Sequence, residues 1–248
     1  MIDGRIAWEA RARQAGNSLR GVLFSGLSDR ANALLHDWHA RIVVERFSPY
    51  VRRGGTVLYV GCGYGRLSTV LGNARNDLKL IGQDISSAYL RTYAQSGFQA
   101  VQADLEHFPF SAGSLDGAMA VTSVMYVERS RVVDALLRVR KALRPEAPLL
   151  LIDPGEELRI FLRFLRFGRG VSTTGGAGFT AREYLRLADS LGMKVIAKGG
   201  NPRSTLLFLA SLGGHVAFPL LSKYLTRDGV TGGYSRLALH RWMLLRSS

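Results

Sequence analysis

Residues 56–68, TVLYVGCGYGRLS, place Gly61, Gly63 and Gly65 at alternate positions directly after an apolar run. The run is typical of a buried strand, and the residues after the last glycine read as the start of a helix. Glycines in such a turn allow the backbone to approach a nucleotide-like ligand closely. The stretch therefore predicts a ligand site at the carboxyl end of a central strand.

Short apolar runs alternate with helical patterns beyond this turn. We expect strands at 56–60, 79–83, 99–103, 116–121, 148–153, 193–198 and 237–245. We expect helices at about 66–74, 86–96, 130–143 and 180–191, and an earlier amphipathic helix at 28–47, capped by Ser28 or Asp29 and stopped before Pro49. This alternation predicts an α/β fold with a doubly wound, mostly parallel seven-stranded sheet covered on both faces.

The chain of 248 residues is long enough for one domain with a well-buried core. We divide it into a helical N-terminal cap, 1–53, and an α/β body, 54–248. Two inserts near the C-terminus, at about 154–179 and 199–236, are rich in Phe, Leu and Gly. Because they follow strand ends, we expect them to form a substrate pocket or lid.

Segment 204–222 is uncharged and reaches the length of a membrane span. Glycines, a proline and His215 interrupt it, which favours a bent buried helix or one on a membrane surface. The first residues, MIDGRIAWEARARQ, contain no uninterrupted apolar run, so we expect no secretory signal. The single cysteine, Cys62, excludes an internal disulfide and a multi-cysteine zinc site. We expect no metal and a cytoplasmic location, with a membrane-peripheral location as the alternative.

The net charge of +14 raises the question of nucleic-acid binding. The basic residues are mostly arginines spread along the whole chain, with two denser clusters at 129–144 and 159–169. A solvated helix face explains such clusters, and contact with an anionic substrate or a membrane surface is the alternative.

The glycine pattern departs from the known nucleotide-binding fingerprints. The dinucleotide pattern Gly-x-Gly-x-x-Gly needs a glycine where Arg66 stands, and no Gly-Lys-Ser/Thr follows for a phosphate loop. Asp84 ends the next expected strand, where a carboxylate can accept hydrogen bonds from both hydroxyls of a ribose. Taken alone, these residues leave both a nucleotide-like ligand and a tight turn without ligand open.

Residues 103–121, ADLEHFPFSAGSLDGAMAV, decide between the cofactors. A strand ending in Asp104 is followed by an acid, by Pro109-Phe110, by a short turn and by Leu115-Asp116. With the glycine turn and Asp84, this order resembles the class I S-adenosylmethionine (SAM)-dependent methyltransferases over about residues 54–198. The closest resemblance is to the branch that includes ubiquinone- and menaquinone-biosynthesis enzymes. It implies a Rossmann-like fold and SAM as the cofactor.

The resemblance also assigns roles by position. Asp84 would bind the ribose hydroxyls, Asp104 would accept from the adenine amino group, and Ile85 would pack on the adenine. The glycine turn and Val121 would meet the methionine end of SAM. The whole expected set is Gly61, Cys62, Gly63, Tyr64, Gly65, Asp84, Ile85, Asp104, Leu105 and Val121.

Tyr59 departs from the family pattern, which usually has an acid two residues before the first glycine. That acid helps to hold the glycine loop and the ammonium region of the cofactor. A tyrosine forms hydrogen bonds but brings no charge. A SAM-binding protein without turnover therefore remains an alternative.

Methyl transfer from a sulfonium is an in-line displacement, so alignment supplies most of the catalysis. Candidates for a base or for a residue facing the methyl group are Tyr126, His215 and His107. Each of them also reads as a packed or surface residue. We expect the N-terminal cap, with Trp8 and Trp38, to close over the cofactor.

The apolar, aromatic inserts favour a small-molecule or lipid-like acceptor. Peripheral membrane contact and a homodimer remain open. An RNA or other nucleic-acid methyltransferase is the alternative suggested by the charge. However, residues 121–124 read Val-Thr-Ser-Val instead of the Asn/Asp-Pro-Pro-aromatic tetrad of amino methyltransferases, and the only cysteine lies in the glycine turn.

Overall fold

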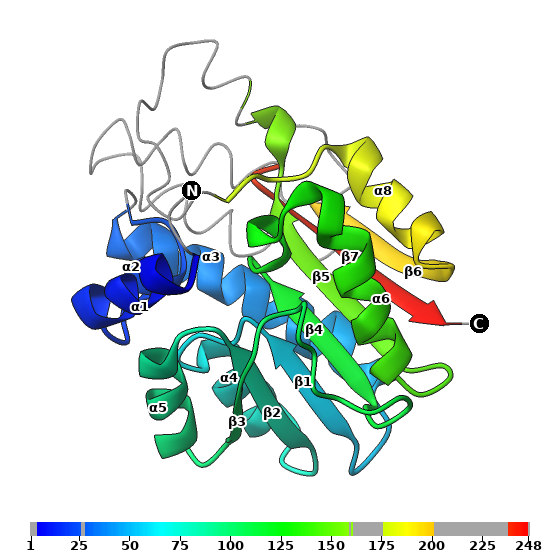
Figure 1. The fold of residues 1–248 in the computed structure, drawn as a ribbon, viewed down its shortest axis with the longest axis horizontal. Helices are drawn as coiled ribbons and strands as arrows, with labels where there is room; N and C mark the ends of the chain where they lie inside the picture. The colour runs from blue at the N-terminus through cyan, green and yellow to red at the C-terminus, as the bar shows by residue number, and fades with distance from the viewer. Residues whose placement is uncertain (1–3, 26–27, 159, 161–175, 201–237, 248) are drawn as a thin grey trace.

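The computed structural model describes residues 4–25, 28–158, 160, 176–200 and 238–247. Its centre is a seven-stranded sheet in the order β3-β2-β1-β4-β5-β7-β6 (Figure 1). The strands are β1 Thr56–Val60, β2 Lys79–Asp84, β3 Gln99–Gln102, β4 Gly117–Val121, β5 Pro148–Pro154, β6 Met193–Gly200 and β7 His240–Ser247. The predicted fold class is confirmed, and the sheet is mixed because β7 runs antiparallel to β5 and β6.

The helices α4 Arg66–Ala74, α5 Ser87–Gln95, α6 Val132–Ala142 and α8 Ala181–Ser190 lie close to their predicted positions. The N-terminal segment contains α1 Gly4–Ala15 and α2 Leu19–Val22, for which no bounds were predicted, and α3 Asp29–Arg41. Ser28 caps α3, since its hydroxyl accepts from the Ala31 N–H at 3.2 Å. A capping box formed by Thr180 and Glu183 starts α8.

The expected helix at 28–47 is not a single α-helix. It continues from α3 into a π-helical segment, η1 Ile42–Phe47, and then into a 3-10 turn, η2 Ser48–Tyr50, which contains Pro49. Two further 3-10 turns, η3 Val124–Tyr126 and η4 Arg129–Arg131, connect β4 to α6. The last strand starts at His240, later than the expected 237, and extends to Ser247.

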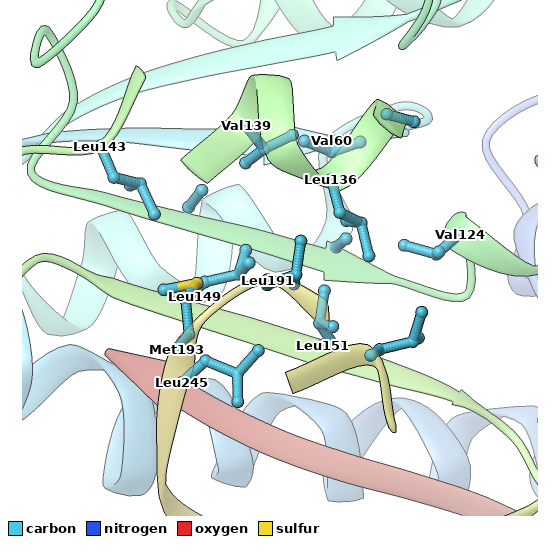
Figure 2. Close-up of a cluster of buried hydrophobic side chains, with 14 of the residues drawn as sticks. Val60, Val124, Leu136, Val139, Leu143, Leu149, Leu151, Leu191, Met193 and Leu245 are labelled. Atoms are coloured by element: carbon cyan, nitrogen blue, oxygen red, sulfur yellow. The ribbon is translucent and has the colours of Figure 1, made fainter. Parts of the chain in front are cut away.

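Alternate side chains of the central strands pack on opposite faces of the sheet. Leu149 and Leu151 of β5 face α6 and α8, in the buried cluster that Figure 2 shows. Leu150 and Ile152 face α3, η1 and α4 in a second cluster. We call these the α8 face and the α3 face. Both faces are apolar and covered, as expected for parallel strands.

The strand order reverses between β1 and β4, which are neighbours in the sheet. In open α/β sheets, ligands bind at the carboxyl ends of the strands at such a reversal. The helices α1 and α2 lie beside this edge (Figure 1). The fold thus brings the ends of β1, β2, β4 and β5 together with the N-terminal helices.

Among the described residues, no helix is both long and apolar enough to cross a membrane. Segment 204–222, most of the expected insert at 154–179 and nearly all of that at 199–236 lie outside the described residues. The division into a cap and a body stays a prediction.

Candidate functional site

The glycine turn is shaped by close contact between β1 and the residues after β4. Gly61, Gly63 and Gly65 have φ angles of 64°, 54° and 92°, which favour glycine. A Cβ atom at Gly61 would lie 2.4 Å from the Cβ of Ser123. Ser123 in turn donates its hydroxyl hydrogen to the carbonyl of Val60 at 2.9 Å. This close contact fixes the backbone where β1 ends.

Thr122, which directly follows β4, has a φ of 56°. A β-branched residue in this region is strained by about 1–3 kcal/mol. Its N–H donates to the carbonyl of Ile152 at 2.7 Å, which holds the conformation. Strain of this kind clusters at ligand sites, and here it lies beside the buried Val121.

Asp84 lies beside the glycine turn, as the resemblance implied. Its two carboxylate oxygens accept from the N–H of Gly63 at 2.8 Å and of Ser86 at 2.9 Å. Burial raises the pKa of Asp84, although these N–H groups oppose the shift. Because each oxygen keeps further acceptor capacity, the carboxylate can bind a ribose hydroxyl while it holds the turn.

Glu9 of α1 is a site residue that the sequence analysis missed. Its carboxylate accepts from the hydroxyls of Ser86 and Ser87, at 2.9 and 3.2 Å, and from the N–H of Ala88 at 3.2 Å. Burial opposes ionisation, but these bonds lower the pKa of Glu9 below its ordinary value. Glu9 thus caps α5 and places α1 next to Asp84.

Asp104 lies in a loop and is partly exposed. It accepts from the N–H groups of Glu106 and His107, at 2.9 and 2.6 Å, and pairs with the Nδ1 of His107 at 3.0 Å. Burial raises the pKa of Asp104, but the bonds from His107 and Glu106 outweigh it and lower the pKa overall. The neighbouring Leu105 is buried. The His107 side chain is 83% exposed.

Of the other candidates, Tyr126 lies in η3 directly after β4. Its ring meets the ring of Trp8 edge-on, with centroids 4.9 Å apart, so α1 covers this end of the sheet. Trp38 instead is buried in the core of the α3 face. His215 lies outside the described residues.

Tyr59 and Arg66 are both buried beneath the glycine turn. Burial raises the pKa of Tyr59 to about 12, so the phenol stays neutral. Arg66 donates to the Nδ1 atoms of His36 and His39, at 3.0 and 3.1 Å. The sequence showed Arg66 only as a missing glycine and gave no sign of its histidine partners.

Asp153, near the end of β5, is a second missed residue. Burial raises the pKa of Asp153 to about 8, although the Met125 N–H, the Tyr184 hydroxyl and the charge of Arg129 all act in the opposite direction. The Met125 N–H lies 3.2 Å from one carboxyl oxygen, and the Tyr184 hydroxyl lies 3.4 Å from the other. The carboxyl group of Asp153 is therefore buried and has a pKa close to neutral pH.

The described part of the chain contains no group of three or more His, Cys, Asp or Glu side chains that could hold a metal ion. Cys62 is a buried free thiol.

Residues 57–146 match a family model described as a methyltransferase domain. These residues of the chain therefore carry a methyltransferase domain. The predicted activity class is thereby confirmed, whereas SAM as the cofactor and the ubiquinone branch stay predictions. No curated protein matches this methyltransferase in sequence.

Several solved structures share the fold of this methyltransferase. The protein in complex with the Haloferax volcanii Trm112 methyltransferase activator is 14% identical, with a TM-score of 0.64, and the match covers 100% of this chain and 99% of that chain. Geranyl diphosphate C-methyltransferase from Streptomyces coelicolor A3(2) is 13% identical, with a TM-score of 0.60 over 85% of this chain and 75% of that chain. The [4+2]-cyclase SpnF is 16% identical, with a TM-score of 0.59 over 85% and 80%.

Proposed function

We propose that this methyltransferase transfers the methyl group of SAM to a small-molecule or lipid-like acceptor at the carboxyl edge of its sheet. The observation that carries the proposal is the junction of Gly63 and Asp84 at 2.8 Å, which joins the glycine turn to the ribose-binding carboxylate. SAM supplies an electrophilic methyl group, and the chain supplies its placement.

The binding roles follow the positions of the residues. The glycine turn and Val121 would receive the methionine end, and Asp84 would bind the ribose. Ile85, Asp104 and the Leu105 amide would form the adenine end. Glu9 would support this arrangement by fixing the N-terminus of α5 beside the ribose site.

A small-molecule acceptor is supported by the neighbour that acts on geranyl diphosphate, whose structure holds an acceptor analogue and S-adenosyl-L-homocysteine (SAH). Trp8 and Tyr126 would shield the methyl group from water next to β4. The inserts at 154–179 and 199–236 would complete the acceptor pocket. Peripheral membrane contact and a homodimer stay predictions.

The arginine cluster at 129–144 supports a nucleic-acid acceptor less than its charge suggests. Arg129 lies over the ring of Phe179, 3.9 Å from its centroid. Arg131 pairs with Glu106 at 2.6 Å, and Arg144 pairs with Asp116 at 3.3 Å. These three cations already have partners within the chain, which favours the small-molecule reading.

Calorimetry with SAM and SAH tests the proposal. We expect Asp84→Ala to lose about 1.5–3 kcal/mol of binding free energy, the scale of hydrogen bonds to a charged group. Asp189→Ala at the exposed carboxyl end of α8 is the matched control, because it removes the same charge at the opposite edge of the sheet. The proposal fails if the wild-type protein binds neither compound, or if Asp84→Ala binds both as tightly as wild type.

A further inference from the structure

Three buried side chains form a hydrogen-bonded chain on the α3 face. Arg66 opens α4, His39 lies in α3 and His240 opens β7. The Arg66 Nη2 lies 3.1 Å from the Nδ1 of His39, and the Nε2 of His39 lies 2.9 Å from the Nδ1 of His240. His39 and His240 are 0% and 1% exposed.

The arginine fixes the proton positions along this chain. A guanidinium can only donate, so the Nδ1 of His39 must accept. Burial and the charge of Arg66 lower the pKa of both His39 and His240, that of His240 to about 3, so both rings are neutral. A neutral His39 then carries its hydrogen on Nε2 and donates it to the Nδ1 of His240. His240 in turn must carry its own hydrogen on Nε2.

The Nε2 atom of His240 is buried and has no hydrogen-bond partner among the described residues. It is therefore a buried N–H donor that lacks an acceptor, which costs free energy unless a ligand supplies one. The ring stands next to Phe24 and Trp38, with centroids 5.6 and 6.5 Å away. His240 pairs with Pro154 in the sheet, at the carboxyl end of β5 where the site lies.

The cluster also carries a positive charge without an acidic partner. Within the described part of the chain, Arg66 forms no ion pair with a carboxylate. Burial lowers the pKa of Arg66, and the electrostatic interactions with Tyr59 and Tyr64 oppose this shift. The charges acting on His39 and His240 likewise come from Arg66 and other histidines. A buried cation of this kind attracts an anion strongly.

We propose that Arg66, His39 and His240 form an anion subsite, in which the Nε2–H of His240 donates to an anionic oxygen of a bound ligand. The identity of that ligand rests on the proposed function: the oxygen belongs to the methionine carboxylate of SAM or to an anionic acceptor. His240 is then a binding residue, while His39 and Arg66 are positioning residues that hold its tautomer and supply the charge.

Nitrogen-15 NMR of the histidine rings in the intact protein tests this directly. We expect His39 and His240 to show the Nε2–H tautomer at neutral pH. Addition of SAH, or of inorganic pyrophosphate as a probe for an anionic acceptor, should move the His240 Nε2–H signal downfield. A shift with SAH alone assigns the methionine carboxylate, and a shift with pyrophosphate assigns the acceptor. An Nδ1–H tautomer of His240, or no shift with either compound, overturns the proposal.

Two variants separate binding from folding. His240→Phe keeps a ring of similar size and should lower the affinity for the active probe about ten- to hundredfold. Arg66→Gln keeps a donor but removes the charge, and should lower the affinity about tenfold. Arg138→Gln removes an equal charge from the exposed side of α6 and should change nothing.

Unchanged affinity in both site variants would contradict the anion subsite. The proposed function fails separately, through the response of SAH binding to Asp84→Ala. Asp84→Ala could leave SAH binding unchanged while pyrophosphate still shifts the His240 signal. The anion subsite would then be supported and the proposed methyl transfer would not.

Discussion

Each face of the sheet buries an arginine at the carboxyl edge, but only one of the two arginines pairs with a described carboxylate. On the α8 face, Arg241 pairs with Glu157 at 2.7 Å and donates to the carbonyl of Phe179 at 2.8 Å. On the α3 face, Arg66 contacts two neutral histidines and forms no ion pair with a described carboxylate. Since arginine cannot give up its proton in a protein, Arg66 keeps a charge that no described carboxylate neutralises.

Asp153 shows why this difference matters. It is even more deeply buried than Arg66. An acid, however, avoids the cost of burial by binding a proton, and the raised pKa of Asp153 reflects this. The two buried groups Arg241 and Asp153 of the α8 face are thus neutralised, one by its pairing with Glu157 and the other by its own proton. Among the described residues, Arg66 on the α3 face keeps its positive charge, which fits the proposed anion subsite.

The largest expected effect concerns the pH dependence of the α8 face. The folded-state pKa of Asp153 is about 8 against an ordinary value of 3.8, so the folded state holds one more proton between these limits. The free energy of unfolding should therefore fall as pH rises, by about 1.4 kcal/mol per pH unit, relative to Asp153→Asn. Urea unfolding at pH 5, 6.5 and 8 measures this difference.

Asp134→Asn on exposed α6 is the control, and its unfolding free energy should run parallel to that of wild type. If the Asp153→Asn curve also runs parallel, Asp153 is ionised in the folded protein. The contrast between the two faces would then be lost.

On the α3 face, the free energy of unfolding should change with pH in the opposite direction. The folded-state pKa of His240 is about 3 against an ordinary 6.5, so the unfolded state binds the proton first as pH falls. Relative to His240→Phe, the unfolding free energy should rise by about 1.4 kcal/mol per pH unit from about pH 3 to 6.5, then stay level. Urea unfolding across this range checks it, and a flat difference would mean that His240 is solvated.

A smaller effect separates the two arginines. Arg241→Met leaves Glu157 without its partner, and we expect a loss of about 3 kcal/mol of unfolding free energy. Arg66→Met removes a charge that has no acidic partner and should cost about 1 kcal/mol through the lost histidine bonds. Equal losses in chemical denaturation would show that both arginines are neutralised to the same extent.

The smallest effect comes from Tyr184→Phe. The hydroxyl of Tyr184 lies 3.4 Å from Asp153, a long contact, so we expect a loss of about 0.5–1 kcal/mol. The midpoint of the Asp153 titration should move upward, because a group that lowers its pKa is removed. A downward shift, followed by carboxyl NMR, would reverse the assigned role of the tyrosine.

The features predicted from the sequence are those that local patterns determine. The limits of β1 and α4 agree with the prediction because an apolar run, a glycine turn and a helical period follow one another there. Asp84 was found because it ends a strand beside that turn. These signals lie within about thirty residues of each other, where periodicity and turn chemistry are readable.

The missed residues depend on contacts between distant parts of the chain. His39 and His240 are 201 residues apart, and Glu9 lies 77 residues from Ser86. Nothing near either position in the sequence indicates the partner. Asp153 looks like an ordinary strand end, and only its full burial distinguishes it. The π-helical segment η1 likewise interrupts a helical pattern that reads as continuous.

The contacts of α1 change what a protease cut near the N-terminus would mean. Cleavage after the exposed Arg13 would release Glu9 and Trp8 on a single peptide. The first residue of α5 and the ring of Tyr126 would lose their cover together. A sample of this protein cut at Arg13 would therefore lack the side chains that cover this end of the sheet. Its properties should not be attributed to the intact chain.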